Sequence, residues 1–157
     1  MAKILFCPFS RLLRNGKTNA KNYPWWGEVV HELSKNHVVT QIGSPGEPEI
    51  EGVSRAYLGF PLESVKKMVK DHHMILSVDN FLPHFANLYD KGGVVIFGRS
   101  DPNIFGYDHN VNILLNREYL RKDQFQIWEI VEYSDRIWPS SDFVVKEVDG
   151  YLSRLTS

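Results

Sequence analysis

The stretch SVDNFLPHFANLYDKGGVVIFGRSDP, Ser77–Pro102, holds two apolar runs with a histidine, prolines and aspartates between and after them. These residue types predict a short strand, a turn, a helix that begins at Pro83 or His84, and a second strand. Proline suits the first helical position, because its missing N–H costs no hydrogen bond there. Asp79 then lies at the carboxyl end of a strand and His84 in the first helical turn. Open α/β sheets bind ligands at such strand ends, and free amides at a helix start attract phosphate.

The same alternation of apolar runs and helical patterns extends through most of the chain. Helical spacing of apolar residues, as in WWGEVVHEL, predicts helices over 24–36, 61–71 and 83–89. Short apolar runs predict strands over 3–9, 38–42, 55–58, 74–78, 94–97 and 111–115. Strands that alternate with helices are typical of βαβ units. The sequence therefore predicts an α/β fold with a mainly parallel sheet of five or six strands and helices on both faces.

The carboxyl-terminal part changes character and reads as helical over 117–136 and 142–155. In the first of these ranges apolar residues recur at about one-turn spacing, and Ser140 or Ser141 is a suitable cap for the second. The four tryptophans sit at helical spacing or beside helix ends, which favours packing over base stacking. We see no linker or repeat. The expected organisation is one domain over 1–157, with an α/β core over 1–115 and terminal helices over 116–157.

Composition and charge narrow the class of protein. A chain of 157 residues with 43% hydrophobic residues fits one ordinary domain. The single cysteine, Cys7, lies in an apolar run, which excludes a disulfide within the chain and suits a reducing cytoplasm. No apolar run is long enough to span a membrane.

The charge of the chain is unevenly distributed. Residues 1–27 carry five Lys or Arg and no Asp or Glu, which gives this segment a charge of +5. The net charge of the whole chain is −1, so the remaining residues together carry −6. Two interpretations of this basic segment are open. Residues 11–21 bind a phosphate group or a nucleic-acid backbone, or the segment is a solvated loop.

Several common motifs are missing. The chain has no GxGxxG, no GxxxxGK[ST], no HExxH, no CxxC and no GxSxG, so the usual dinucleotide, P-loop, zinc and serine-nucleophile signatures do not apply. His72 and His73 are adjacent, and at the start of a strand they would point to opposite faces. We therefore expect no metal site.

Four motifs in order resemble the carboxyl-terminal half of glycosyltransferase family 9, the heptosyltransferases. That half typically reads K-x-W-P ahead of a helix, a strand that ends in G-x-x-x-E, then D-[ST]-G-x-x-H-x-A and F-G-x-[ST]-x-P. The resemblance covers about residues 1–110. The matching residues are Lys21, Pro24, Gly43, Glu47, Asp79, His84, Ala86, Phe97, Gly98, Ser100 and Pro102. The chain departs from the pattern at Phe81, where the family has glycine, and in being about half as long as a member of the family.

The resemblance implies a Rossmann-like half of a GT-B fold, which holds a nucleotide sugar without a metal. It places Lys21 at the donor phosphate and Glu47 at the nucleoside. Asp79, Asn80 and His84 would then lie around the diphosphate and sugar. In the same region Arg99 and Ser100 are candidates for a further phosphate contact. Developing negative charge on a leaving nucleoside diphosphate would be stabilised by such groups.

The resulting expectation is a small, metal-independent glycosyltransferase that moves a sugar from a nucleotide donor to a hydroxyl acceptor. Asp79 and His84 are the first candidates for the catalytic base, although Asp79 as a helix cap and His84 as a core histidine remain simpler alternatives. Two other functions stay open: a non-catalytic nucleotide or nucleotide-sugar binding module, and a transferase that glycosylates a hydroxylated DNA base. A homo-oligomer or a separate acceptor domain is the expected partner.

Overall fold

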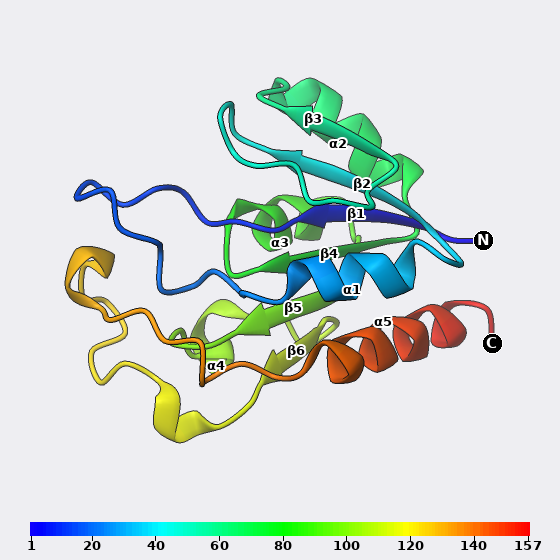
Figure 1. Ribbon diagram of the computed structural model, residues 1–157. Helices are drawn as coiled ribbons and strands as arrows, with labels where there is room; N and C mark the ends of the chain where they lie inside the picture. Colours follow the sequence, from blue (N-terminus) through cyan, green and yellow to red (C-terminus); the bar gives the residue numbers. More distant parts are fainter.

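The computed structural model describes all residues 1–157 as a single parallel sheet covered by helices (Figure 1). The strands follow the order β3-β2-β1-β4-β5-β6, and every neighbouring pair is parallel. Their bounds are β1 Lys3–Cys7, β2 Val38–Gly43, β3 Arg55–Leu58, β4 Met74–Val78, β5 Gly93–Phe97 and β6 Val111–Leu114. The expected Rossmann-like α/β fold is confirmed, with six strands. The strand order reverses between β1 and β4, so the loops after these two strands diverge and leave a crevice between them.

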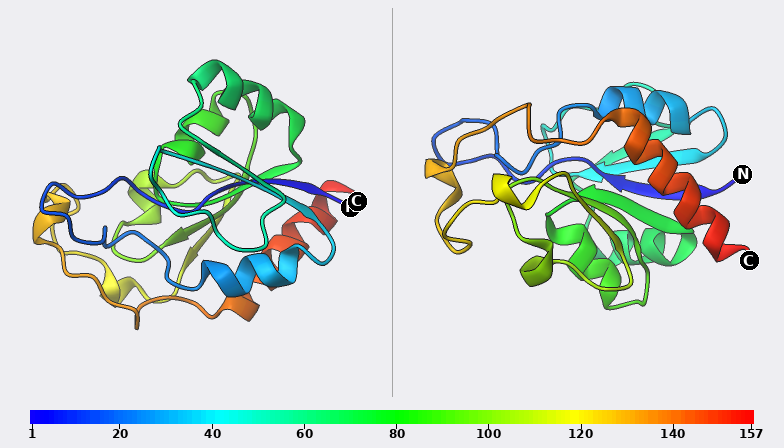
Figure 2. Two further views of the ribbon diagram at one scale, coloured as in Figure 1. Left: turned by 45° about the horizontal axis from the view of Figure 1, so that its top comes forward. Right: turned by 90° about the horizontal axis from the view of Figure 1, so that it is seen from below.

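Helices cover both faces of the sheet because the central strands are buried on both sides. In β1, Ile4 and Phe6 belong to one core cluster and Leu5 and Cys7 to the other. The first cluster is covered by α1 (Trp26–Leu33) and α5 (Ser141–Leu155), and the second by α2 (Leu62–Asp71) and α3 (Phe81–Asn87). Figure 2 shows the two groups of helices on opposite sides of the sheet. This double burial explains why β4 and β5 are continuous apolar runs rather than alternating ones.

The start of α3 differs from the expectation. The helix begins at Phe81, two residues before Pro83, because the Asn80 side chain caps it by accepting a hydrogen bond from the Leu82 N–H at 3.0 Å. Asp79 does not cap the helix; its carboxylate instead pairs with Lys21. A further short helix, α4 (Pro102–Phe105), follows β5 and is capped by Asp101.

The expected helix over 117–136 is wrong. This range forms only two short 3-10 turns, η1 (Arg117–Tyr119) and η2 (Trp128–Ile130), joined by irregular chain. The helix expected over 142–155 is confirmed as α5. The Ser140 hydroxyl caps this helix by accepting a hydrogen bond from the Phe143 N–H at 3.2 Å. The loop after β1 and the segment around η2 lie side by side at the carboxyl edge of the sheet, where Arg14 pairs with Glu129 (left side of Figure 1).

No helix in the structure combines the length and the apolar character that crossing a membrane requires.

Candidate functional site

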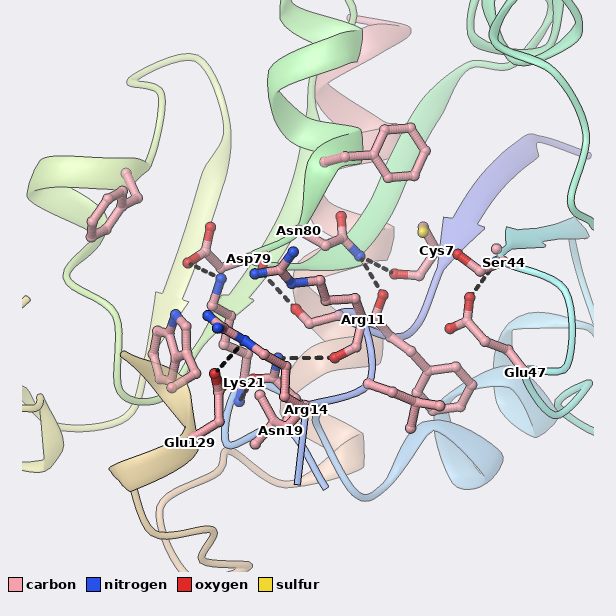
Figure 3. Close-up of a pocket in the computed structure, with 18 of the residues that line it drawn as sticks. Cys7, Arg11, Arg14, Asn19, Lys21, Ser44, Glu47, Asp79, Asn80 and Glu129 are labelled. Carbon is pink, nitrogen blue, oxygen red and sulfur yellow. Dashed lines mark hydrogen bonds and ion pairs between the residues drawn. The ribbon is translucent and has the colours of Figure 1, made fainter. Parts of the chain in front are cut away.

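A cleft of about 760 Å³ lies at the carboxyl ends of β1, β2 and β4, across the point where the strand order reverses (Figure 3). Open parallel sheets bind their ligands at this position. The long loop after β1 forms one wall and the segment around η2 forms another. The lining residues that carry polar groups are Cys7, Ser10, Arg11, Arg14, Asn19, Lys21, Ser44, Glu47, Asp79, Asn80, His84, Arg121, Trp128 and Glu129. Five of the seven expected site residues are among them: Lys21, Glu47, Asp79, Asn80 and His84.

The cleft gathers positive charge from the loop after β1. Arg11, Arg14 and Lys21 all line it, so the basic segment turns these cations toward the cleft (Figure 3). Arg14 Nε lies 3.2 Å from Glu129 Oε1, and Lys21 Nζ lies 3.6 Å from Asp79 Oδ2. Arg11 has no ion-pair partner. From this loop, an anion that enters the cleft would therefore meet the unpaired guanidinium of Arg11 and two cations that are already held by carboxylates.

Asn80 ties the two diverging loops together. Its Nδ2 donates to the carbonyl oxygens of Cys7 and Phe9 at 3.1 and 3.2 Å, while its Oδ1 caps α3. The neighbouring Asp79 carbonyl accepts a hydrogen bond from Ser10 Oγ at 2.9 Å. These bonds fix the floor of the cleft, and they use the polar atoms of Asn80 within the protein.

Glu47 lies at the far end of the cleft, after β2. Its carboxylate accepts a hydrogen bond from the Ser44 N–H, and it approaches Gly43 so closely that a side chain at 43 would collide with it. Burial raises the pKa of the Glu47 carboxyl, and the hydrogen bond from Ser44 opposes that rise. An acidic side chain after the second strand is suited to the hydroxyl groups of a ribose.

Two other lining residues bear on the chemistry. Burial raises the pKa of the Cys7 thiol to about 12, so this residue stays protonated and is no nucleophile at neutral pH. Phe81 is 44% exposed and lines the cleft next to Asn80, with its ring 6.3 Å from that of Phe85. The phenyl group occupies space that a glycine at this position would leave open.

Arg99 and Ser100 lie outside the cleft lining. Arg99 Nη1 donates to the Tyr119 carbonyl at 3.0 Å, and Ser100 is fully buried. The chain turns after β5 so that the next charged group, Asp101, pairs with Arg117 at 2.8 Å. Arg99 therefore faces the terminal segment rather than the cleft, and the buried Ser100 hydroxyl has no hydrogen-bond partner.

Arg121 and Trp128 line the cleft and were not expected there. The guanidinium carbon of Arg121 lies 3.7 Å from the Trp128 ring centre, and its N–H groups donate to the carbonyls of Gln124 and Gln126. Burial lowers the pKa of Arg121, which still stays charged at neutral pH. Lys21 Nζ lies 4.9 Å from the same ring. The helical spacing in 117–136 placed Trp128 on a packed helix face, so no sequence signal indicated this contact.

No group of three or more His, Cys, Asp or Glu side chains in the structure is arranged to hold a metal ion.

No protein-family model matches the sequence, and a search of curated proteins finds no match either. Solved structures do resemble the fold. E. coli ADP-heptose LPS heptosyltransferase II superposes with a TM-score of 0.71 at 19% identity, over 99% of this chain and 48% of that one. The glycosyltransferase TibC of enterotoxigenic E. coli, described as iron-containing and dodecameric, gives 0.67 at 16% identity, over 99% of this chain and 46% of that one. E. coli heptosyltransferase WaaC with ADP gives 0.56 at 17% identity, over 71% of this chain and 37% of that one.

These likenesses establish the fold. The expected resemblance to a heptosyltransferase half is confirmed at that level, and the chain spans about half the length of the solved structures it resembles. Nothing in the comparisons supports the binding of nucleic acid.

Proposed function

We propose that the cleft binds a nucleoside diphosphate sugar and that the protein acts as a glycosyltransferase. The observation that carries this proposal is the arrangement along the cleft. A carboxylate after β2 lies at one end, and cations from the loop after β1 meet the loop after β4 across the strand-order reversal. A nucleoside diphosphate has the same order of groups, with ribose hydroxyls at one end and a doubly charged diphosphate beside them. The fold is shared with a heptosyltransferase whose name includes ADP-heptose.

Each residue then has a defined part in binding. Glu47 accepts hydrogen bonds from the ribose, while Arg11 and Lys21 neutralise the diphosphate. His84, exposed at the cleft, contributes an N–H toward the same anion. Asp79 Oδ2 lies 3.6 Å from Lys21 Nζ, and the carboxylate orients the ammonium group. Because it is engaged in this ion pair, Asp79 is better suited to positioning Lys21 than to acting as the general base.

The transfer step follows from this placement. The acceptor hydroxyl oxygen bonds to the anomeric carbon as the bond from that carbon to the diphosphate oxygen breaks. The leaving nucleoside diphosphate keeps the electron pair, and the hydroxyl proton passes to a base. Cations placed where the leaving charge grows lower the barrier, because in a preformed site they need no reorganisation. ADP-heptose is the first donor to test, since the named relatives in fold act on it or bind it.

A second function is favoured by one observation. Phe81 fills part of the cleft where the family has glycine, and this would suit a module that binds a nucleotide or nucleotide sugar without transferring the sugar. Turnover separates the two functions. A bound donor that is hydrolysed or transferred supports the enzyme, whereas stable binding with no product over hours supports the module.

The binding experiment combines thermal shift with titration calorimetry, using ADP, UDP, GDP and ADP-heptose. A ligand at 100 times its dissociation constant stabilises the folded state by about 2.7 kcal/mol. Lys21→Ala and His84→Ala should each weaken ADP binding about tenfold to a hundredfold, as expected for the loss of a charge-assisted hydrogen bond. Lys17→Ala is the matched control, because Lys17 lies in the same loop but is exposed outside the cleft lining. Unchanged affinity in both cleft variants would move the nucleotide elsewhere.

A further inference from the structure

His84 has a hydrogen-bond partner just outside the cleft. The Tyr107 hydroxyl lies 2.7 Å from His84 Nδ1, and the two rings meet edge to face with centroids 5.4 Å apart. His84 lines the cleft and Tyr107 does not. His84 Nε2 makes no hydrogen bond within the protein, so this nitrogen is free to bind a ligand in the cleft.

Tyr107 is itself held firmly. Its carbonyl oxygen accepts hydrogen bonds from Asn112 Nδ2 and from the Asn110 N–H, both at 3.0 Å. The preceding residue, Gly106, ends α4 in a turn so close that a Cβ there would lie 2.6 Å from the Pro102 carbonyl oxygen. Turn and hydrogen bonds together set the position of the Tyr107 ring relative to α3.

The Tyr107 hydroxyl can either donate to a bare Nδ1 or accept from an Nδ1–H. Donation is the favoured arrangement, because a phenol is a stronger hydrogen-bond donor than acceptor. A tyrosine hydroxyl keeps its proton at neutral pH and can donate it in a hydrogen bond. When it donates to Nδ1 of a neutral histidine, the ring proton must reside on Nε2. The opposite tautomer would turn a bare Nε2 lone pair toward an anionic ligand, and the two would repel each other.

We infer that Tyr107 is a positioning residue, which holds His84 as the Nε2–H tautomer and aims this N–H into the cleft as a donor to a phosphate oxygen. The identity of the ligand rests on the proposed function; the tautomer does not. Tyr107 touches no reacting atom and acts only through His84.

The first test uses the free protein and needs no ligand. Nitrogen-15 NMR of the imidazole, assigned by the signals lost in His84→Gln, should show Nδ1 bare and Nε2 protonated at neutral pH. In Tyr107→Phe the signals should move toward a mixture of both tautomers. Tyr89→Phe is the matched control, because the Tyr89 hydroxyl makes no hydrogen bond and its ring, just after α3, packs on Phe85 of that helix. A proton found on Nδ1, or His84 signals that Tyr107→Phe leaves unchanged, would overturn the inference.

The second test is a double-mutant cycle with ADP. Tyr107→Phe should weaken binding about threefold to tenfold, as is typical for one hydrogen bond. In the His84→Ala background the same change should have no further effect, because the residue acts through the imidazole. Additive losses would show a general structural effect instead. If the wild-type protein fails to bind ADP at all, the proposed function fails, whereas the tautomer measurement still decides the part of Tyr107.

Discussion

The position of the Glu47 carboxylate depends on Gly43, the last residue of β2. A Cβ at position 43 would lie 2.7 Å from Glu47 Oε1 and 3.3 Å from Leu58 Cδ2. Contacts below 3.0 Å force one partner to move, and the carboxylate is the more mobile of the two. A methyl group at this position therefore pushes Glu47 out of its hydrogen bond with Ser44 and away from the end of the cleft.

We predict that Gly43→Ala and Glu47→Ala both weaken ADP binding about tenfold, because a hydrogen bond to a charged group contributes roughly 1.5 to 3 kcal/mol. Binding of inorganic pyrophosphate should stay the same in both variants, since the carboxylate lies at the ribose end. Calorimetry with both ligands measures the difference. An equal loss for pyrophosphate would show that the two changes disturb the whole cleft and would remove Glu47 from the ribose.

His72, at the end of α2, predicts a pH dependence of stability. The ring is buried and its Nδ1 lies 2.6 Å from the Met68 carbonyl oxygen, while Nε2 is buried without a partner. Burial disfavours the charged ring and so lowers its pKa in the folded state. The unfolded chain, with a histidine pKa of about 6.5, then binds more protons in acid than the folded chain does. The contribution of His72 is complete above about pH 6.5 and is lost as the pH falls below it.

Urea denaturation at pH 7.5 and 5.5 measures this loss. His72→Asn keeps a donor near Met68 without a titrating group, so the fall in unfolding free energy should be smaller than in the wild type, by up to about 1.4 kcal/mol per pH unit. Exposed His31 gives the control His31→Gln, which should retain the wild-type fall. The fall in unfolding free energy is compared between variants, because Glu47, whose pKa burial raises, makes the folded state more stable as the pH falls and so opposes the effect of His72 in every variant. Equal slopes in all three proteins would contradict the assignment.

At the scale of elements, the strands were predictable and the segment over 117–136 was not. The central strands β1, β2, β4 and β5 are short, mainly apolar runs, and burial on both faces of the sheet favours the extended conformation for such runs. The edge strands β3 and β6 are less buried and follow from the alternation of strands and helices. In 117–136 the apolar residues also recur at near-helical spacing. Here, however, the side chains of Asn116 and Asp123 accept hydrogen bonds from nearby backbone N–H groups. Such local bonds compete with the helical ones, and the chain becomes an irregular loop.

The same contrast holds for the cleft. Parallel strands end at one edge, so Lys21 and Asp79 could be placed together from the order of strands and loops, whereas Glu47 was placed there by the resemblance to the heptosyltransferase half. Arg121 and Trp128 could not, because their position depends on the path of an irregular segment that no periodicity describes.

This terminal segment is attached to the sheet through Trp138. The ring is 6% exposed, its Nε1 donates to the Ser134 carbonyl at 2.8 Å, and it lies so close to Gly98 after β5 that a Cβ there would be 2.5 Å away. Trp138→Ala should lower the unfolding free energy by about 3 to 5 kcal/mol, as for other buried aromatic residues. Trp25→Ala, with a ring 38% exposed, should cost clearly less. Denaturant unfolding compares the two, and similar losses would show that the terminal segment is not anchored here.

At the scale of the whole molecule, large apolar side chains stay exposed around the cleft. Leu12 is 81% exposed in the loop after β1, and Phe125 and Ile130 are 79% and 63% exposed in the segment beside it. By contrast, Ile137 and Trp138 fold back into the core, so part of the apolar content of the terminal segment packs in the same cluster as residues of the sheet. The exposed remainder forms a rim that an additional protein surface would bury.

We predict that sugar transfer depends on such a surface, supplied by a second copy or a partner. A transferase must hold the acceptor against the anomeric carbon, and this chain spans about half the length of the solved structures that share its fold. If a second copy completes the site, light scattering should show self-association, and specific activity should rise with protein concentration over the same range. Phe125→Ser and Ile130→Ser, at two exposed residues outside the cleft lining, should shift both curves to higher concentration while ADP affinity in the cleft stays the same. If a different partner completes it, the chain alone should bind donor without transferring sugar. A strict monomer whose specific activity is high and independent of concentration would show instead that one copy of this domain holds donor and acceptor together.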